Sequence, residues 1–355
     1  MSVQSTKGDA ANAASPGSLP RTFVGGNPGF LQRAGSQPLL RAVTAVAAVC
    51  SFAIIFVMLA FLFIYAWPAI VFNGTNFFTG VEWNIGNQYG AVSASAATVK
   101  AQPGASFGAL VFIFGTLATA CLTMLFAVPL SILVAVALVY RVMPQIRPLA
   151  NALVELMAGV PSVVYGLWGM VVLVPWIGNA LGPFVDRYFG WVPFLGGGGG
   201  SGNGLLAATF ILVLMVTPIM VATIRDVVSA QASSIFEASM ALGGTSWQSV
   251  TKAVLPSVRT GIVASILIAF GRALGETMAV LMVCGAAINA FPHNVFQPVN
   301  TIAAVIVSQL ESALTDSTGM AQRSLAELAV SLFVITLTVN IIARGILRGA
   351  DRGGK

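Results

Sequence analysis

Residues 261–284 read GIVASILIAFGRALGETMAVLMVC, a run long enough to cross a lipid bilayer as one helix. Arg272 and Glu276 are its only charged residues. Ionised side chains at membrane depth are costly unless they have a partner or line a water-filled cavity, so they usually mark a substrate or ion path. The four-residue spacing predicts that both lie on one face of the helix. The stretch indicates a membrane transporter, and a structural ion pair between packed helices is the alternative.

The composition of the whole chain agrees with a membrane protein. Of its 355 residues, 57% are hydrophobic and only 8% are charged, whereas soluble domains contain about 25% charged residues. The net charge is +6, but the basic residues are scattered beside apolar runs and do not form a stripe with interleaved aromatic residues. We therefore expect an all-α polytopic protein that contacts membrane lipid and does not bind nucleic acid.

Apolar runs near the length of a bilayer crossing predict six transmembrane helices. Apart from Arg272, only Lys100, Arg187 and Arg323 among the basic residues fall in segments predicted to be outside, so the positive-inside rule places both termini in the cytoplasm. Glu327, near the outer start of the last run, is expected to be solvated. The predicted spans are about 42–67, 108–139, 149–177, 204–224, 258–284 and 325–347.

The chain ends differ in composition from the apolar centre. Residues 1–41 are rich in Gly, Ser, Asn and Pro, which is typical of a disordered tail. Residues 42–349 form the predicted six-helix membrane domain, and residues 350–355 form a second cytoplasmic tail. An outer segment at about 71–106 contains several turn signals, and we expect it to dock or pack.

The sequence gives no support to an enzymatic or nucleotide-binding function. The glycine-rich stretches at 196–204 and 243–246 lack the lysine of a phosphate-binding loop. His293 is the only histidine, and no serine has a recognisable base partner. We therefore predict no catalytic residue, no metal site and no cofactor bound by this chain.

A cytoplasmic stretch between the fourth and fifth spans resembles the coupling loop of ABC-type importer permeases. In that family the pattern is Glu-Ala-Ala, three residues, Gly, nine residues, an aliphatic residue, one further residue and Leu-Pro. This chain departs from it at Ser239 and Ala253. The resemblance assigns ATPase coupling to five residues that match the motif and to the divergent Ser239. These residues are Glu237, Ala238, Ser239, Gly243, Leu255 and Pro256. The resemblance places the coupling loop at 225–257 and the permease core at about 105–347.

The same stretch has a plain physical interpretation. A short helix, a turn at Gly243 and a second helix stopped at Pro256 would form an elbow that seats in a partner's groove. An ordinary helical hairpin is the alternative. About sixteen residues separate Pro256 from Arg272, which corresponds to roughly 24 Å of continuous helix. We expect this one helix to join the elbow to the charged pair.

Three further segments together resemble the permease subunits of phosphate-specific ABC importers. They are 77–84 (FFTGVEWN), 159–166 (GVPSVVYG) and 271–280 (GRALGETMAV), and the first resembles the C-type more than the A-type subunit. The resemblance implies a type I ABC importer permease fold in a bacterial plasma membrane. It also implies pairing with a homologous A-type permease, an ATPase dimer that binds ATP and Mg, and a phosphate-binding protein outside.

The chemistry of Arg272 and Glu276 is compatible with the expected transport of phosphate. Arg272 stays protonated and offers forked donors that match phosphate oxygens. Glu276 would hold Arg272 at rest until the anion displaces it, or would limit how tightly the anion binds. Glu155 ranks below them as a pathway residue, while Gly271 and Gly275 would allow close helix packing. A permease for another oxyanion and a proton-coupled carrier that uses Glu276 remain alternatives.

Overall fold

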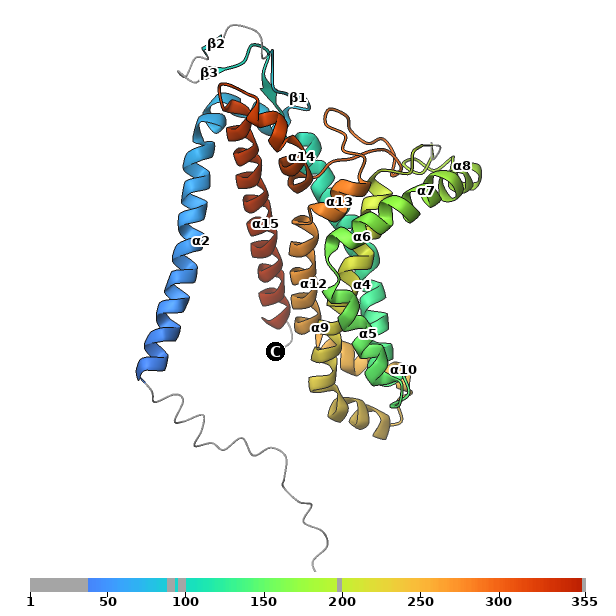
Figure 1. Cartoon of the computed structure of the whole chain (residues 1–355). Helices are drawn as coiled ribbons and strands as arrows, with labels where there is room; N and C mark the ends of the chain where they lie inside the picture. The colour runs from blue at the N-terminus through green and yellow to red at the C-terminus, as the bar shows by residue number, and fades with distance from the viewer. Residues whose placement is uncertain (1–37, 88–92, 95–99, 197–199, 353–355) are drawn as a thin grey trace, which may run out of the picture. The chain divides into compact units, whose positions relative to one another are not determined.

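The computed structural model describes residues 38–87, 93–94, 100–196 and 200–352 (Figure 1). The chain separates into two compact units, residues 1–58 and 59–355. The described part of the first unit is the beginning of helix α2 (Pro38–Asn73), which starts four residues before the predicted span. Residues 1–37 of the predicted tail lie outside the described residues. The second unit contains all the other elements.

The second unit is predominantly helical, which confirms the predicted all-α class. Its long helices are α4 (Leu110–Tyr140), α9 (Leu205–Ala241) and α15 (Met320–Arg352). The shorter helices are α3 (Asn76–Thr79), α5 (Arg147–Gly159), α6 (Ser162–Trp168), η1 (Gly169–Leu173), α7 (Val174–Trp176), η2 (Ile177–Leu181), α8 (Gly182–Phe189), α10 (Ser246–Gln248), η3 (Ser249–Val254), α11 (Leu255–Ser257), α12 (Arg259–Leu274), α13 (Met278–Val283) and α14 (Ile302–Leu314).

Two small antiparallel ladders lie in the segment between α3 and α4. Strand β1 (Trp83–Asn84) pairs with β4 (Ser106–Phe107), and β2 (Ser93–Ala94) pairs with β3 (Lys100–Ala101). Trp83 on β1 packs edge-on against Phe107 and Phe112, with ring centroids 5.1 and 5.6 Å apart. The ladder β1–β4 thereby fixes this segment onto the start of α4.

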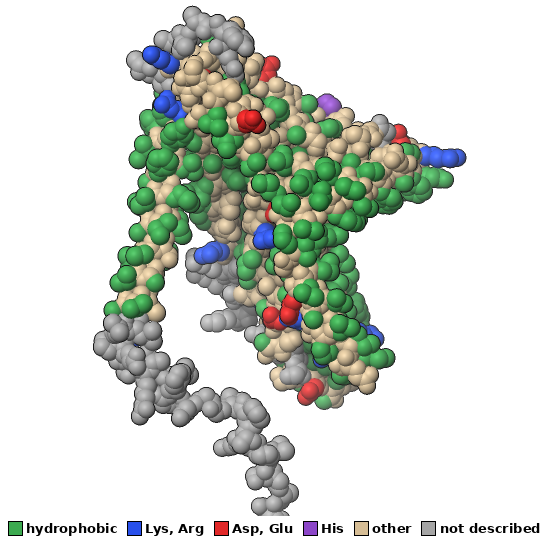
Figure 2. Space-filling model, viewed as in Figure 1, with side chains coloured by type: hydrophobic (Ala, Val, Ile, Leu, Met, Phe, Trp, Pro, Cys, Tyr) green, Lys and Arg blue, Asp and Glu red, His purple; other side chains and the backbone are tan. Residues whose placement is uncertain are grey.

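Five helical segments within the described ranges are long and apolar enough to cross a membrane, or six if one bent pair counts as a single span. The third span is not where the sequence predicted it. The predicted 149–177 run is interrupted after α5, and the apolar crossing segment is 162–189. Val160 is extended because it precedes Pro161, and the residue before a proline disfavours helical geometry. Hydrophobic side chains cover much of the visible surface (Figure 2).

The π-helical turns η1, η2 and η3 each end two residues before a proline, which is Pro175, Pro183 or Pro256. Proline lacks an N–H donor, and its ring crowds the carbonyl one turn earlier. A widened turn relieves that crowding without breaking the helix. The apolar segment after Pro161 therefore continues through two prolines.

The main core forms where α4 and α9 pack along each other. Small buried residues such as Ala120 and Ala127 on α4 and Ala208 on α9 let the two backbones approach closely. The hydroxyls of Thr116, Thr119 and Thr123 donate to carbonyls of their own helix. These bonds satisfy the polar groups where no water is available.

A turn between α14 and α15 is organised by Asp316. Its carboxylate accepts hydrogen bonds from the Thr318 and Ala321 N–H groups at 2.9 Å and from the Thr318 hydroxyl. Burial would raise the pKa of Asp316, but these hydrogen bonds outweigh burial and hold the pKa below its usual value. The carboxylate therefore stays ionised and caps the start of α15.

Asn73, at the end of α2, is joined to α15 by a buried polar contact. The Asn73 amide donates to a Glu327 carboxylate oxygen at 2.7 Å, and Glu327 is only 5% exposed. The expectation that Glu327 is solvated was wrong, because position along a predicted span does not reveal which helix covers a side chain.

We expect Asn73→Leu to destabilise the protein by about 1–3 kcal/mol, because it leaves a buried acceptor without its donor. Glu327→Gln should change stability less, since a neutral amide can still accept from Asn73. Thermal unfolding of the purified protein in one detergent would compare the two variants. An unchanged unfolding temperature for Asn73→Leu would contradict this role for the contact.

Candidate functional site

Arg272 and Glu276 lie on either side of a break in the predicted fifth span. Helix α12 ends at Leu274, Gly275 caps it, and α13 begins only at Met278. The prediction that both charged residues share one face of a continuous helix was therefore wrong. Glycine weakens the helix here, and the Thr277 hydroxyl donates to the Gly275 carbonyl at 3.2 Å within the break.

The break places each charged side chain at a helix end whose backbone groups favour its charge. Arg272 lies in the last turn of α12, where backbone carbonyls favour a cation. The Glu276 carboxylate accepts from the Ala279 N–H at 3.4 Å, near the start of α13. Arg272 and Glu276, which both lie in the described part of the chain, do not form an ion pair with each other. Arg272 is exposed in this chain, whereas Glu276 is 9% exposed.

The segments 159–166 and 271–280, which carried the family resemblance, meet in space through α6 and α13. Gly166 on α6 makes this contact possible. A Cβ atom there would lie 2.9 Å from the Ala279 Cα and 2.8 Å from the Met282 sulfur. Tyr165 is fixed beside it, because its hydroxyl donates to the Met157 carbonyl at 2.7 Å. The short helix that follows Glu276 is thus held against the third span.

Among the described residues, no neighbouring helix packs on Gly271 or Gly275. A Cβ atom at Gly271 would meet nothing within 4 Å, and one at Gly275 would approach only its own helix. Gly271 instead lines a cavity of about 390 Å³ between α12 and α15. The polar residues of this cavity are Asn340 and Arg344, which the sequence analysis missed as site candidates because they lie on a different helix.

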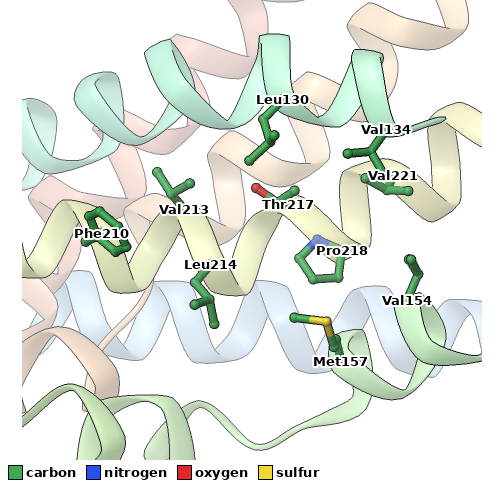
Figure 3. Close-up of a pocket in the computed structure, with 10 residues that line it drawn as sticks. All are labelled: Leu130, Val134, Val154, Met157, Phe210, Val213, Leu214, Thr217, Pro218 and Val221. Atoms are coloured by element: carbon green, nitrogen blue, oxygen red, sulfur yellow. The ribbon is translucent and has the colours of Figure 1, made fainter. Parts of the chain in front are cut away.

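A second cavity, of about 350 Å³, lies among α4, α5 and α9 (Figure 3). Thr217 supplies the single polar side chain among the 10 residues drawn, and the others are apolar. An oxyanion placed there would lose its hydration without gaining charged partners. This cavity is unsuited to the chemistry predicted for Arg272. Its lining comprises Leu130, Val134, Val154, Met157, Phe210, Val213, Leu214, Thr217, Pro218 and Val221.

Glu155 lies on α5, away from the break, and pairs with Arg225 on α9. Its carboxylate is 3.1 Å from Arg225 Nη2, which also contacts Asp226 at 2.8 Å. Figure 1 shows α5 at the end of the membrane domain that contains the elbow. The structure therefore does not bring Glu155 together with Arg272 and Glu276.

The predicted elbow is present, with different helix limits. Its first arm is the last part of α9, so residues 225–241 of the predicted loop are helical. Gly243 has φ +87°, a conformation that favours glycine, and its N–H donates to the Met240 carbonyl. Ser239 accepts from the Gly244 N–H at 3.1 Å, while Glu237 and Ala238 are exposed.

The second arm begins at a capping box formed by Thr245 and Gln248 and continues through α10, η3 and α11. Leu255 is partly buried against the main core, and Pro256 is exposed. The helix continues one residue past Pro256, to Ser257, and then bends by 71° into α12. As expected, one helix, α12, runs from just after the elbow through Arg272, but it does not continue the helix of the elbow directly, because Val258 leaves helical geometry.

The elbow also exposes two large apolar side chains that the motif does not include. Leu242 is 90% exposed and Trp247 is 62% exposed. Exposed apolar groups that cluster at one projecting turn are typical of a docking surface. Both apolar residues are visible in the sequence of the elbow. Their exposure was not predictable from it, because it depends on the turn at Gly243.

Comparisons with known proteins agree on the family. Residues 127–353 match the family described as "Binding-protein-dependent transport system inner membrane component". "Phosphate transport system permease protein PstC 1" of Mycobacterium tuberculosis is 42% identical over 290 residues, which cover 81% of this chain and 86% of that protein. "Phosphate transport system permease protein PstC" of Mesorhizobium japonicum is 34% identical over 320 residues, covering 89% and 91%.

A similar solved structure is a chain of a bacterial alginate ABC transporter in complex with an alginate pentasaccharide-bound periplasmic protein. It superposes with a TM-score of 0.53 at 16% identity, and the match covers 90% of this chain and 97% of that one. This likeness shows a shared fold. The chain belongs to the family of binding-protein-dependent transport system inner membrane components.

Proposed function

We propose that this chain is the C-type permease subunit of an ATP-driven phosphate importer. The observation that carries the proposal is Arg272, an exposed cation at the end of α12, within a chain whose relatives are named as phosphate transport permeases. Phosphate needs a cation that remains charged when water is removed, and a guanidinium meets that need with paired donors.

The broken helix supports a pathway at this place. Non-helical backbone is tolerated at membrane depth where protein covers it or where it lines a water-filled cavity. Gly275 is exposed and Gly271 faces a cavity, so within this chain the break is open on one side. A homologous A-type permease packed against that side would enclose Arg272 and complete a route for the anion.

The cavity beside Gly271 extends the route along α12. Asn340 and Arg344 on α15 line it together with Ala264, Leu267 and Ile268 on α12. An anion that leaves Arg272 would find a second cation there and would not cross a wholly apolar surface. Glu276, held at the start of α13, limits the net positive charge near Arg272, so the anion is not bound too tightly to leave.

The energy source lies outside this chain in the proposal. The elbow docks on an ATPase dimer, which binds ATP and Mg, while a phosphate-binding protein delivers the ion at the opposite end. The chain itself is a non-catalytic subunit with both termini in the cytoplasm of a bacterial cell. Movement of the elbow would reach Arg272 through the 71° bend between Ser257 and Arg259.

Reconstitution of the assembled complex into liposomes tests the function. We expect ATP hydrolysis and ³²P-phosphate uptake to rise together when the phosphate-loaded binding protein is added, and sulfate and molybdate to compete weakly. Preference for another oxyanion would overturn the substrate assignment. Uptake without ATP that collapses with an uncoupler would identify a proton-coupled carrier instead.

A further inference from the structure

A polar cavity of about 300 Å³ lies at the elbow end of the membrane domain, apart from Arg272. The end of α4, the first part of α5 and residues 225–229 of α9 surround it, and four of its residues are charged. Both the Glu155–Arg225 pair and the start of α5 contribute to its wall. The lining residues are Leu138, Val139, Arg147, Asn151, Glu155, Arg225, Asp226 and Ser229.

Within the part of the chain that the structure describes, three buried polar atoms of this lining have no hydrogen-bond partner. They are Nη1 of Arg225, Nε of Arg147 and Oδ1 of Asn151. Two of the three are N–H donors on guanidinium groups. Buried polar atoms are almost always paired in folded proteins, and an unpaired donor on a charged group is especially costly. The two arginines of this lining therefore keep buried donors that no acceptor among the described residues satisfies.

Other contacts hold the two arginines in place. Arg225 uses Nη2 and Nε for Glu155 and Asp226, which leaves Nη1 unused. Arg147 donates from Nη2 to the Val139 and Val142 carbonyls, 2.8 and 3.3 Å away, at the end of α4. The side chains of Glu155 and Asp226 are 60% and 69% exposed, against 13% for Arg225. The carboxylates are thus largely solvated, while the free donors are buried.

We propose that this cavity binds a phosphate group through Nη1 of Arg225 and Nε of Arg147. Guanidinium donors fixed in advance match phosphate oxygens well, and little side-chain entropy remains to be lost. The Asn151 amide supplies a further donor when it turns its NH₂ group inward. The phosphate belongs either to an anionic lipid headgroup or to a free phosphate ion. The site does not rest on the proposed transport function, since binding is measured without turnover.

The test uses the assembled complex in nanodiscs, with Arg272→Ala in the background to remove the first anion site. One arm uses phosphatidylglycerol and counts retained lipid by native mass spectrometry. The other arm uses phosphatidylcholine and measures equilibrium binding of ³²P-phosphate. The variants are Arg225→Gln and Asn151→Leu, and the second keeps both arginines and the Glu155 pair if the first fails to fold. Arg141→Gln, an exposed arginine near the same end, is the matched control.

We expect both variants, and not the control, to lower binding at least tenfold in one arm. Loss of retained phosphatidylglycerol identifies a headgroup site, and loss of ³²P binding identifies a site for the free ion. The proposal is overturned if neither probe binds, or if Asn151→Leu and Arg225→Gln bind both probes as well as the control does.

Discussion

Arg272→Ala is expected to reduce phosphate uptake by about 100-fold or more while the complex still assembles. A pair of charge-assisted hydrogen bonds to the anion contributes about 3 kcal/mol, and each 1.4 kcal/mol corresponds to about tenfold in an equilibrium. Arg272 is exposed in this chain, so its removal leaves no buried void. Uptake of ³²P-phosphate by proteoliposomes, normalised to assembled complex, measures the effect.

Arg272→Lys should recover only part of the activity, because an ammonium keeps the charge but lacks the forked donors. Arg187→Ala is the matched control, since Arg187 is also exposed but lies on α8. It should leave uptake near that of the unmodified complex. Normal uptake by an assembled Arg272→Ala complex would remove the guanidinium from the pathway.

Glu276→Gln separates the two roles considered for Glu276. The idea that it holds Arg272 at rest requires an ion pair, which this structure does not contain. Its hydrogen bond to the Ala279 N–H instead attaches it to the start of α13. In the proposed function Glu276 instead tempers the positive potential near Arg272, so we expect Glu276→Gln to slow release of the anion.

Hydropathy predicted the second, fourth and sixth spans well, because α4, α9 and α15 are long apolar helices with few interruptions. It failed where the chain breaks inside an apolar run. Each break lies inside a predominantly apolar run of the sequence, and hydropathy averaged over a bilayer-length window does not register it. The local signals were present in Pro161 and Gly275, but each is also tolerated within membrane helices.

The candidate site was predictable only as a list of residue types. Arg272 is conspicuous because charge is rare in an apolar run. The Glu155–Arg225 pair joins residues 70 positions apart, and its formation depends on how α5 and α9 rotate about their axes. Asn340 and Arg344 reach the same cavity as Gly271 for a similar reason. Such relations depend on packing between helices, which a single sequence does not specify.

Leu242→Asp is expected to weaken binding of the ATPase by about 10- to 100-fold and to abolish phosphate-stimulated ATP hydrolysis. Leu242 is 90% exposed beside the left-handed Gly243, so it projects from the elbow into the space that a partner would fill. Burying a leucine contributes about 1.5–3 kcal/mol, and a carboxylate in the same apolar groove would add a desolvation cost. Co-purification of the ATPase and hydrolysis in proteoliposomes measure both effects.

The exposure of Leu242 also makes the experiment interpretable. A side chain that makes so little contact within its own chain can be changed without disturbing the core, so the Leu242→Asp protein should fold and keep its unfolding temperature. Leu314→Asp is the matched control, because Leu314 is 64% exposed at the end of α14, far along the sequence from the elbow. It should retain the ATPase. If Leu242→Asp also retains the ATPase and its stimulation by phosphate, the elbow tip is not the surface through which ATP-driven motion enters the membrane domain.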